Sequence, residues 1–309
     1  MVSIMRWKGS SLIFSIIIFT TIISPYYCKA DYNVEVGQIF NYTMSESKVF
    51  ASAYNETYST EGFSIYTYKT EVGNPFNVNV TYLGPNTIDY KIIIGTIAWE
   101  DFVNSYNDYG RLRNMVIYTP NIAQILVSNW ENFSSNFFDS ALNIICNLFF
   151  LEVLEGSWRT LRNFRSDFIT EQSSLWDESL QFSLEDKLSE NTEEIMVEWL
   201  FKGDYNYLTV FNNFNNYSSE VFTKLSYSKI DGNILGLWIK GTSSGIVRNE
   251  TFDFSLEQKF EMDGYTLSNF EICATNNSSF NLWSELIGIF CIIVPFNFLL
   301  KKRKKIIKD

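Results

Sequence analysis

Histidine does not occur in the 309 residues of the chain. Its absence excludes the Ser-His-Asp and Cys-His nucleophile systems, zinc sites with histidine ligands and pH switches based on imidazole. The run GTSSG from Gly241 to Gly245 does match the G-x-S-x-G nucleophile elbow. Strand signals follow this run where the elbow requires a helix, so we interpret it as a Gly/Ser loop. Carboxylate, tyrosine and lysine chemistry remains, and we predict that the chain is not an enzyme.

Cysteine is scarce, with four residues in the chain. Cys28 and Cys291 lie in apolar terminal segments, so Cys146 and Cys273 are the two that share the middle of the chain. They could form one disulfide in an oxidising compartment or remain two buried thiols, and the sequence favours neither. A middle segment of about 250 residues buries enough core to fold without a disulfide scaffold.

Basic residues are few between positions 31 and 285, where 15 lysines and arginines accompany 34 aspartates and glutamates, a net charge of −19. Such an acidic segment repels nucleic acid, and we exclude nucleic-acid binding. No Asp-x-Asp-x-Asp-Gly calcium loop occurs, and we expect neither a metal nor a cofactor. Adjacent acids at Glu100 and Asp101 and at Glu193 and Glu194 could serve a glycosidase, but solvation of the surface is the favoured interpretation.

Long apolar runs are confined to the two ends of the chain. At the start, Arg6 and Lys8 precede an apolar run from Leu12 to Ile23 and a small residue, Ala30. This order is typical of a signal peptide, and we predict that residues 1–30 are cleaved, with an uncleaved anchor as the alternative.

At the other end, a charge-free run from Leu286 to Leu300 is followed by five basic residues, Lys301 to Lys305. This stop-transfer pattern predicts a transmembrane helix over residues 280–300 and a cytoplasmic tail over residues 301–309. The alternative is an amphipathic or buried terminal helix. We therefore predict a single-pass protein of the cell membrane whose domain, residues 31–279, is extracytoplasmic.

Eight Asn-x-Ser/Thr sequons lie in that domain and none lies outside it. Together with a signal peptide they make the domain a candidate glycoprotein. Asn79 is the best-supported candidate, because strand periodicity places it on a solvent-facing side. The candidate sites are Asn41, Asn55, Asn79, Asn132, Asn216, Asn249, Asn276 and Asn277.

Strand signals fill both halves of the domain. Phe76, Val78 and Val80 alternate with polar residues, which predicts a strand with one buried face. Further strands are expected over residues 34–44, 62–72 and 87–98, and again from about 179 to about 270. The dipeptides Asp231-Gly232 and Asp263-Gly264 predict hairpin turns.

Between about residues 119 and 172 the pattern predicts a helical insert. A first helix is expected over residues 134–155, ended by Gly156, and a second over residues 157–170. The first is charge-free from Ser140 to Leu151, so it must be buried. We expect one α+β domain, mainly β, in which a curved antiparallel sheet wraps around this apolar helix. Two small β domains joined by a helical pair are the alternative.

Three arginines, Arg159, Arg162 and Arg165, are spaced by three along the second helix. They could bind an anionic headgroup or phosphate. The favoured interpretation pairs Arg159 with Glu155 and the other two with neighbouring carboxylates.

Two short stretches carry a resemblance to a known group of proteins. They are VEVGQIFNY, from Val34 to Tyr42, and YSKIDGNIL, from Tyr227 to Leu235. Both resemble the V-x-V-G-x-x-F-x-Y strand and the Y-x-K-x-D-G-x-L-L hairpin of archaeal single-pass cell-surface proteins of the choice-of-anchor type. The resemblance implies a surface-anchored protein of unassigned function, with no functional residues to transfer.

The sequence predicts a non-enzymatic surface protein that serves envelope structure or recognition, with the membrane and a surface protein or lipid as partners. One alternative is a hydrophobic-ligand carrier or sensor, which needs a cavity between the sheet and residues 137–151. If the side chains of Phe137, Phe138, Phe149 and Phe150 fill that space, the carrier hypothesis fails. A carboxylate-dependent glycosidase is a more distant alternative.

Overall fold

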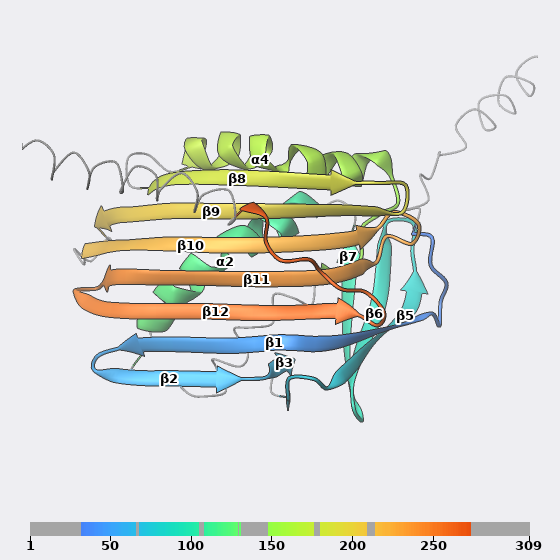
Figure 1. The fold of residues 1–309 in the computed structure, drawn as a ribbon, viewed down its shortest axis with the longest axis horizontal. Helices are drawn as coiled ribbons and strands as arrows, with labels where there is room; N and C mark the ends of the chain where they lie inside the picture. Colours follow the sequence, from blue (N-terminus) through green and yellow to red (C-terminus); the bar gives the residue numbers. More distant parts are fainter. Residues whose placement is uncertain are drawn as a thin grey trace, which may run out of the picture.

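A computed structural model describes residues 32–65, 68–104, 108–128, 130, 148–175, 180–208 and 214–272. This part of the chain is mainly β, as predicted, and consists of an open ten-stranded antiparallel sheet, a two-stranded sheet and two helices (Figure 1). No helix within these ranges is both long enough and apolar enough to cross a membrane. The predicted signal peptide, transmembrane helix and basic tail lie outside the described residues, as do Cys146 and Cys273, and they stay predictions.

The strands and helices follow one another in two strand blocks separated by the helices. The first block is β1 Ile39–Ala53, β2 Glu56–Glu61, β3 Phe63–Ile65, β4 Tyr68–Thr70, β5 Pro75–Leu83, β6 Thr87–Ile94 and β7 Ile97–Asn104. The helices are α2 Asp108–Ser128 and α4 Glu155–Leu175. The second block is β8 Leu180–Glu190, β9 Glu194–Leu208, β10 Phe214–Ser228, β11 Ile234–Val247 and β12 Glu250–Met262.

Strand β1 joins the two blocks into one sheet. The strand order is β7-β6-β5-β1-β12-β11-β10-β9-β8, and β2 pairs with β1 beside this path. One side of β1 pairs with β12 from Tyr42 to Ala53. The other side pairs with β5 from Ile39 to Thr43 and with β2 from Lys48 to Ala53. Apart from β3 and β4, which pair with each other, the strands of both blocks therefore belong to a single sheet.

The predicted period of two is confirmed in the strands that carry it. Phe76, Val78 and Val80 of β5 are buried, while Asn77 and Asn79 lie on the other face. In β9, alternate residues such as Val197 and Trp199 face the core in the same way. The run from Gly241 to Gly245, which we predicted as a loop, lies within β11, where Gly245 (φ 144°) allows close approach of β10.

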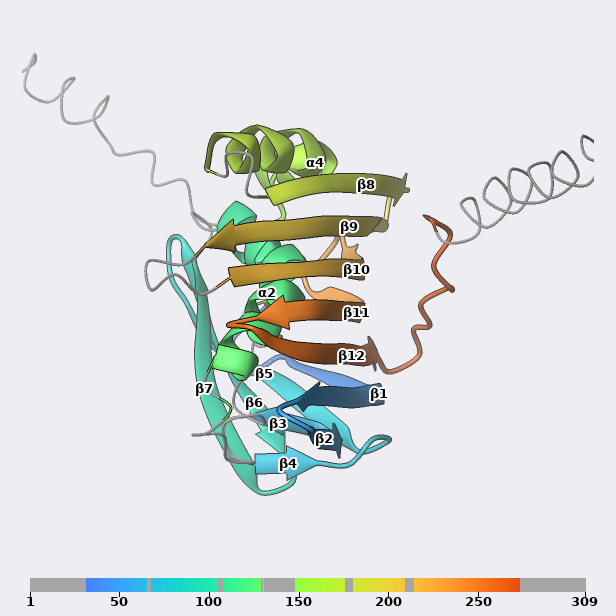
Figure 2. The same ribbon diagram turned by 90° about the vertical axis from the view of Figure 1, so that its left-hand side faces the viewer.

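The helix that the sheet covers is not the predicted one. Helix α2 begins at Asp108, well before residue 119, and buries Leu112, Met115 and Val116. Figure 2 shows α2 against the faces of β9–β12, with β5–β7 curving past it. The curvature around a helix was expected, but the helix comes from an earlier segment.

The predicted helix over residues 134–155 is contradicted in its described part, residues 148–154. Phe150 forms a β-bridge with Asn233, and the backbone amide of Ile234 donates to the carbonyl of Phe149 over 2.8 Å. This segment is extended because the β10–β11 turn satisfies its backbone groups. Gly156 lies in the first turn of α4 and ends no helix. Residues 131–147, including Phe137 and Phe138, lie outside the described residues.

Phe149 is the centre of an aromatic core. Its ring centroid lies 5.4 Å from Tyr42 of β1, 6.1 Å from Phe76 of β5, 5.8 Å from Tyr90 of β6 and 5.6 Å from Phe260 of β12. These spacings and their tilted or edge-on angles are those of attractive aromatic pairs. The space beside Phe149 is therefore filled by protein side chains.

Helix α4 covers the end of the sheet at β8 and β9. The ring centroid of Phe164 lies 4.2 Å from that of Trp199, and Phe168 packs edge-on against Phe201. The predicted helix over residues 157–170 is confirmed here, with a longer extent at both ends.

Residues Asp263–Ile272, which we call the strap, run from β12 toward β9 across the face of the sheet that is opposite α2 (Figure 1). Beneath the strap, Lys224 of β10 and Glu198 of β9 form a buried ion pair of 2.6 Å. Lys224 also donates to the carbonyl of Asn269, and Glu198 accepts from the amides of Glu271 and Ile272. The prediction of strand up to residue 270 is wrong, because β12 ends at Met262. The side chains of Lys224 and Glu198 hold the strap on the sheet in place of backbone pairing.

Replacing Phe149 with alanine should lower the free energy of unfolding by about 3–5 kcal/mol, because it empties the centre of the aromatic core. Denaturation of the purified full chain, monitored by tryptophan fluorescence, measures the change. Phe102→Ala is the matched control, since that ring is 63% exposed, and it should have a small effect. Equal effects of the two substitutions would show that Phe149 does not organise the core.

Replacing Lys224 with methionine should cost about 3–5 kcal/mol of unfolding free energy, because Glu198 then keeps a buried charge without a cation. We also expect faster proteolysis within the strap. Lys202→Met is the control, since Lys202 pairs with Glu220 on the exposed surface, and this pair should contribute about 0–1 kcal/mol to the free energy of unfolding. If the strap of Lys224→Met resists protease as well as that of Lys202→Met, the buried pair does not hold it.

Candidate functional site

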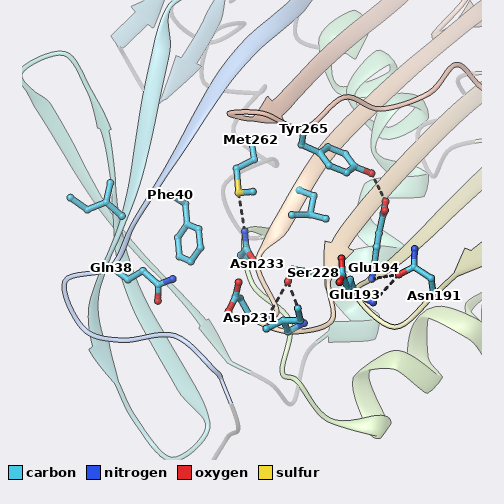
Figure 3. A pocket seen from close by; sticks show the side chains of 13 residues that line it. Gln38, Phe40, Asn191, Glu193, Glu194, Ser228, Asp231, Asn233, Met262 and Tyr265 are labelled. Carbon is cyan, nitrogen blue, oxygen red and sulfur yellow. Dashed lines mark hydrogen bonds between the residues drawn. The ribbon is translucent and has the colours of Figure 1, made fainter.

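An open cleft of about 500 Å³ lies at the end of the sheet where four segments meet (Figure 3). These are the start of β1, the β8–β9 turn, the β10–β11 turn and the region where β12 leads into the strap. The lining residues are Gln38, Ile39, Phe40, Asn191, Glu193, Glu194, Ser228, Ile230, Asp231, Asn233, Leu235, Met262 and Tyr265.

The β8–β9 turn is shaped by Asn191. Its side-chain oxygen accepts hydrogen bonds from the backbone amides of Glu193 and Glu194, both over 2.8 Å. Asparagine is favoured in turns because its side chain replaces a backbone acceptor in this way. The turn places both glutamates at the cleft (Figure 3).

The β10–β11 turn contains the predicted Asp231-Gly232 pair, and the prediction of a hairpin here is confirmed. Gly232 has φ 75°, and a Cβ atom there would lie 2.2 Å from the carbonyl oxygen of Leu151. Ser228 holds the turn by accepting from the amides of Ile230 and Asp231. Only glycine fits this position, because both its backbone angle and the close approach exclude a side chain.

The two turns are tied to each other and to α4. The backbone amide of Lys229 donates to the carbonyl of Glu193 over 2.7 Å. The side chain of Lys229 binds Glu190 over 2.6 Å, and Arg162 of α4 binds the same carboxylate through two nitrogens. These donors hold the pKa of Glu190 at about 2, well below its ordinary value. The carboxylate of Glu190 thus ties α4 to the two turns that border the cleft.

The cleft is lined by three carboxylates and by no lysine or arginine. Glu194 is used within the protein, because it accepts from Ser226 over 2.6 Å and from the hydroxyl of Tyr265. Burial and this hydrogen bond raise the pKa of Tyr265, which keeps its hydroxyl a donor. The Asp231 carboxyl has its pKa raised by burial. Within the described residues, the side chains of Glu193 and Asp231 have no hydrogen bond or ion pair.

Asn233 holds an unpaired acceptor beside the cleft. The residue is 1% exposed, and its side-chain nitrogen donates to the sulfur of Met262 over 3.3 Å. Its Oδ1 atom is buried and has no hydrogen-bond partner in the described part of the chain. A buried polar atom left unpaired costs free energy, so such an atom calls for an explanation.

Apolar side chains complete the cleft. Phe40 of β1 and Leu235 of β11 line it, and Ile39 and Ile230 stand at its rim with 54% and 51% of their surface exposed. The cleft therefore combines hydrogen-bond acceptors with apolar contact surface, which is typical of binding sites. No group of three or more acidic or cysteine side chains in the described ranges is arranged to hold a metal.

The structure does not bring the three arginines into one site. Arg162 pairs with Glu155 and Glu190, and Arg165 donates to the carbonyl of Leu184 and lies 3.6 Å from Asp186. Pairing of these two with carboxylates agrees with the favoured interpretation. The predicted pair of Arg159 with Glu155 is not formed in the described part of the chain, where Glu155 binds Arg162.

The sequons lie away from the core. Asn41, Asn55, Asn216 and Asn249 are exposed, and Asn79 is half-buried on the outward face of β5. Asn132, Asn276 and Asn277 lie outside the described residues. Whether any of these asparagines is glycosylated stays a prediction.

Sequence reasoning noted parts of the cleft without joining them. The Asp231-Gly232 turn and the Glu193-Glu194 pair were identified separately, as a hairpin and as solvated acids. They meet because β9 and β10 pair in the register Ile195 with Tyr227. Asn233 and Tyr265 were missed, since a single asparagine or tyrosine after a turn carries no local signal.

Replacing Glu190 with glutamine should lower the free energy of unfolding by about 1–3 kcal/mol at pH 7, because two charge-assisted contacts are lost. The pKa of Glu190 is lowered in the folded state, so this stabilisation is present above the ordinary value of 4.5 and is lost as pH falls toward about 2. Denaturation at pH 7 and near pH 2 measures the difference between the two proteins. Glu100→Gln is the control, since its carboxylate is 76% exposed. A difference that persists unchanged in acid would contradict the assignment.

The two stretches that carry the family resemblance lie side by side in the structure. Gln38, Ile39 and Phe40 of the first and Ser228, Ile230, Asp231, Asn233 and Leu235 of the second line the same cleft. Val34 to Gly37 precede β1 and contain a turn, so the first stretch is only partly strand. The resemblance to choice-of-anchor surface proteins itself stays a prediction. Comparisons with protein-family models, curated proteins and solved structures found no match for the chain.

Proposed function

We propose that this protein is a membrane-anchored, non-enzymatic surface protein that recognises a ligand through the cleft. The observation that supports recognition is an open cleft with two carboxylates and one buried amide oxygen that the described residues leave without donors. Acceptors arranged around apolar contact surface bind a ligand without reacting with it.

The carrier alternative receives less support than recognition. It requires space beside Phe149 and Phe150, and both residues are fully buried among the rings of four strands. A close-packed aromatic core leaves no room for an acyl chain at that place. Glycosidase chemistry is also less favoured, because Ser226 and Tyr265 already occupy the Glu194 carboxylate.

Membrane anchoring is supported by the sequence on either side of the described domain. The strap ends at Ile272, and the charge-free run with its basic block follows within a short stretch of chain. A run of apolar residues followed by lysines and arginines favours a membrane span with a cytoplasmic tail. The acidic domain would then be displayed away from the anionic cytoplasmic leaflet.

The full chain, expressed with an epitope tag after Asp309, should resist extraction of membranes with alkaline carbonate. Protease added to intact cells should remove the domain and leave the tag protected. Replacing Ile292 and Val294 with lysine should release the chain from the membrane, because each buried charge costs about 2.5–3.5 kcal/mol. Ile306→Lys is the control. A full chain found soluble inside cells, with its domain protected from external protease, would overturn the proposal.

A further inference from the structure

The cleft presents acceptors from two different turns. Glu193 comes from the β8–β9 turn, and Asp231 and Asn233 come from the β10–β11 turn. Figure 3 shows the Asn233 amide beside Met262, among the side chains that line the cleft. Its Oδ1 atom is unpaired among the described residues but buried, so the acceptors that a ligand in the open cleft can reach are the carboxylates of Glu193 and Asp231.

The nearby cations are already used by the protein. Lys229 donates to Glu190 over 2.6 Å and to the carbonyl of Asn191 over 3.1 Å. Arg162 is held by Glu190 and Glu155. Two carboxylates at the cleft therefore have no cation partner among the described residues. A ligand that brings both positive charge and N–H donors satisfies them.

The apolar wall restricts the shape of that ligand. Phe40 and Leu235 offer contact to an alkyl stem, and Ile39 and Ile230 extend this contact at the rim. Phe40 and Tyr265 also line the cleft, and aromatic rings attract positive charge. A bare metal ion uses none of this surface, and the described acidic groups form no metal cluster.

We infer that the cleft binds a primary ammonium or guanidinium group carried on an apolar stem. This inference rests on the proposed function, because it names the ligand class of the recognition cleft. A basic side chain of a polypeptide and a free polyamine share this chemistry. Either ligand would donate to Glu193 and Asp231 and lay its stem against Phe40.

Calorimetric titration of the purified full chain in detergent micelles tests the inference. The probes are acetyl-Gly-Lys-Gly-amide, the same peptide with norleucine in place of lysine, and spermidine. We expect the lysine peptide or spermidine to bind and the norleucine peptide to bind at least about tenfold more weakly, because it lacks the charge-assisted bonds. Binding of the lysine peptide points to a polypeptide source, and binding of spermidine alone points to a free polyamine.

Asp231→Asn should weaken amine binding by about tenfold, since it keeps the shape of the side chain and removes one charge. Glu185→Gln, which neutralises an exposed carboxylate of β8 outside the cleft, should leave affinity unchanged. Thermal unfolding verifies that both variants are folded. Equal binding of the lysine and norleucine peptides, equal effects of the two variants, or no binding of any amine would overturn the inference.

A neutral oligosaccharide such as chitotriose separates this inference from the proposed function. If chitotriose binds, if Asp231→Asn weakens that binding, and if the amines do not bind, the ligand class is wrong while recognition through the cleft stands. A chain that is soluble inside cells and binds none of these probes would overturn both.

Discussion

The contacts of Phe149 with rings from β1, β5, β6 and β12 are the interaction on which the rest of the structure depends. Neither strand block buries this ring alone, because the rings come from both sides of the helical region. The same backbone segment also bonds to the β10–β11 turn through Phe149 and Leu151. The core contact thus fixes the position of the turn that carries Asp231 and Asn233 into the cleft.

The fold was predictable where the signal is local. Val78 and Trp199 lie on strands in which apolar and polar residues alternate, and the buried face of each strand follows this period of two. The charge-free stretch around Phe149 was misread as helix, because apolar composition does not distinguish a helix from an extended segment whose partners, such as Ile234, are distant in the sequence. Helix α2 did have a signal, since Leu112, Met115 and Val116 are spaced as one helical face.

The cleft was less predictable than the fold because it depends on register. Each of its turns is encoded locally, one by Asn191 and the other by Asp231 and Gly232. Their meeting depends on the pairing of β9 with β10, and the wall at Tyr265 depends on how the strap docks. Sequence patterns describe single elements, whereas a site built from four segments is a property of their packing.

The central place of β1 has a consequence for synthesis. Among the described strands, β1 is the first to leave the ribosome and its partner β12 is the last. Thr43 and Asp263, which meet at this pair, are 220 residues apart. Until β12 has been made, one edge of β1 has no partner, and an open edge can pair with another nascent chain. Folding of the sheet therefore completes only after translation has passed Met262, and the domain matures as a whole.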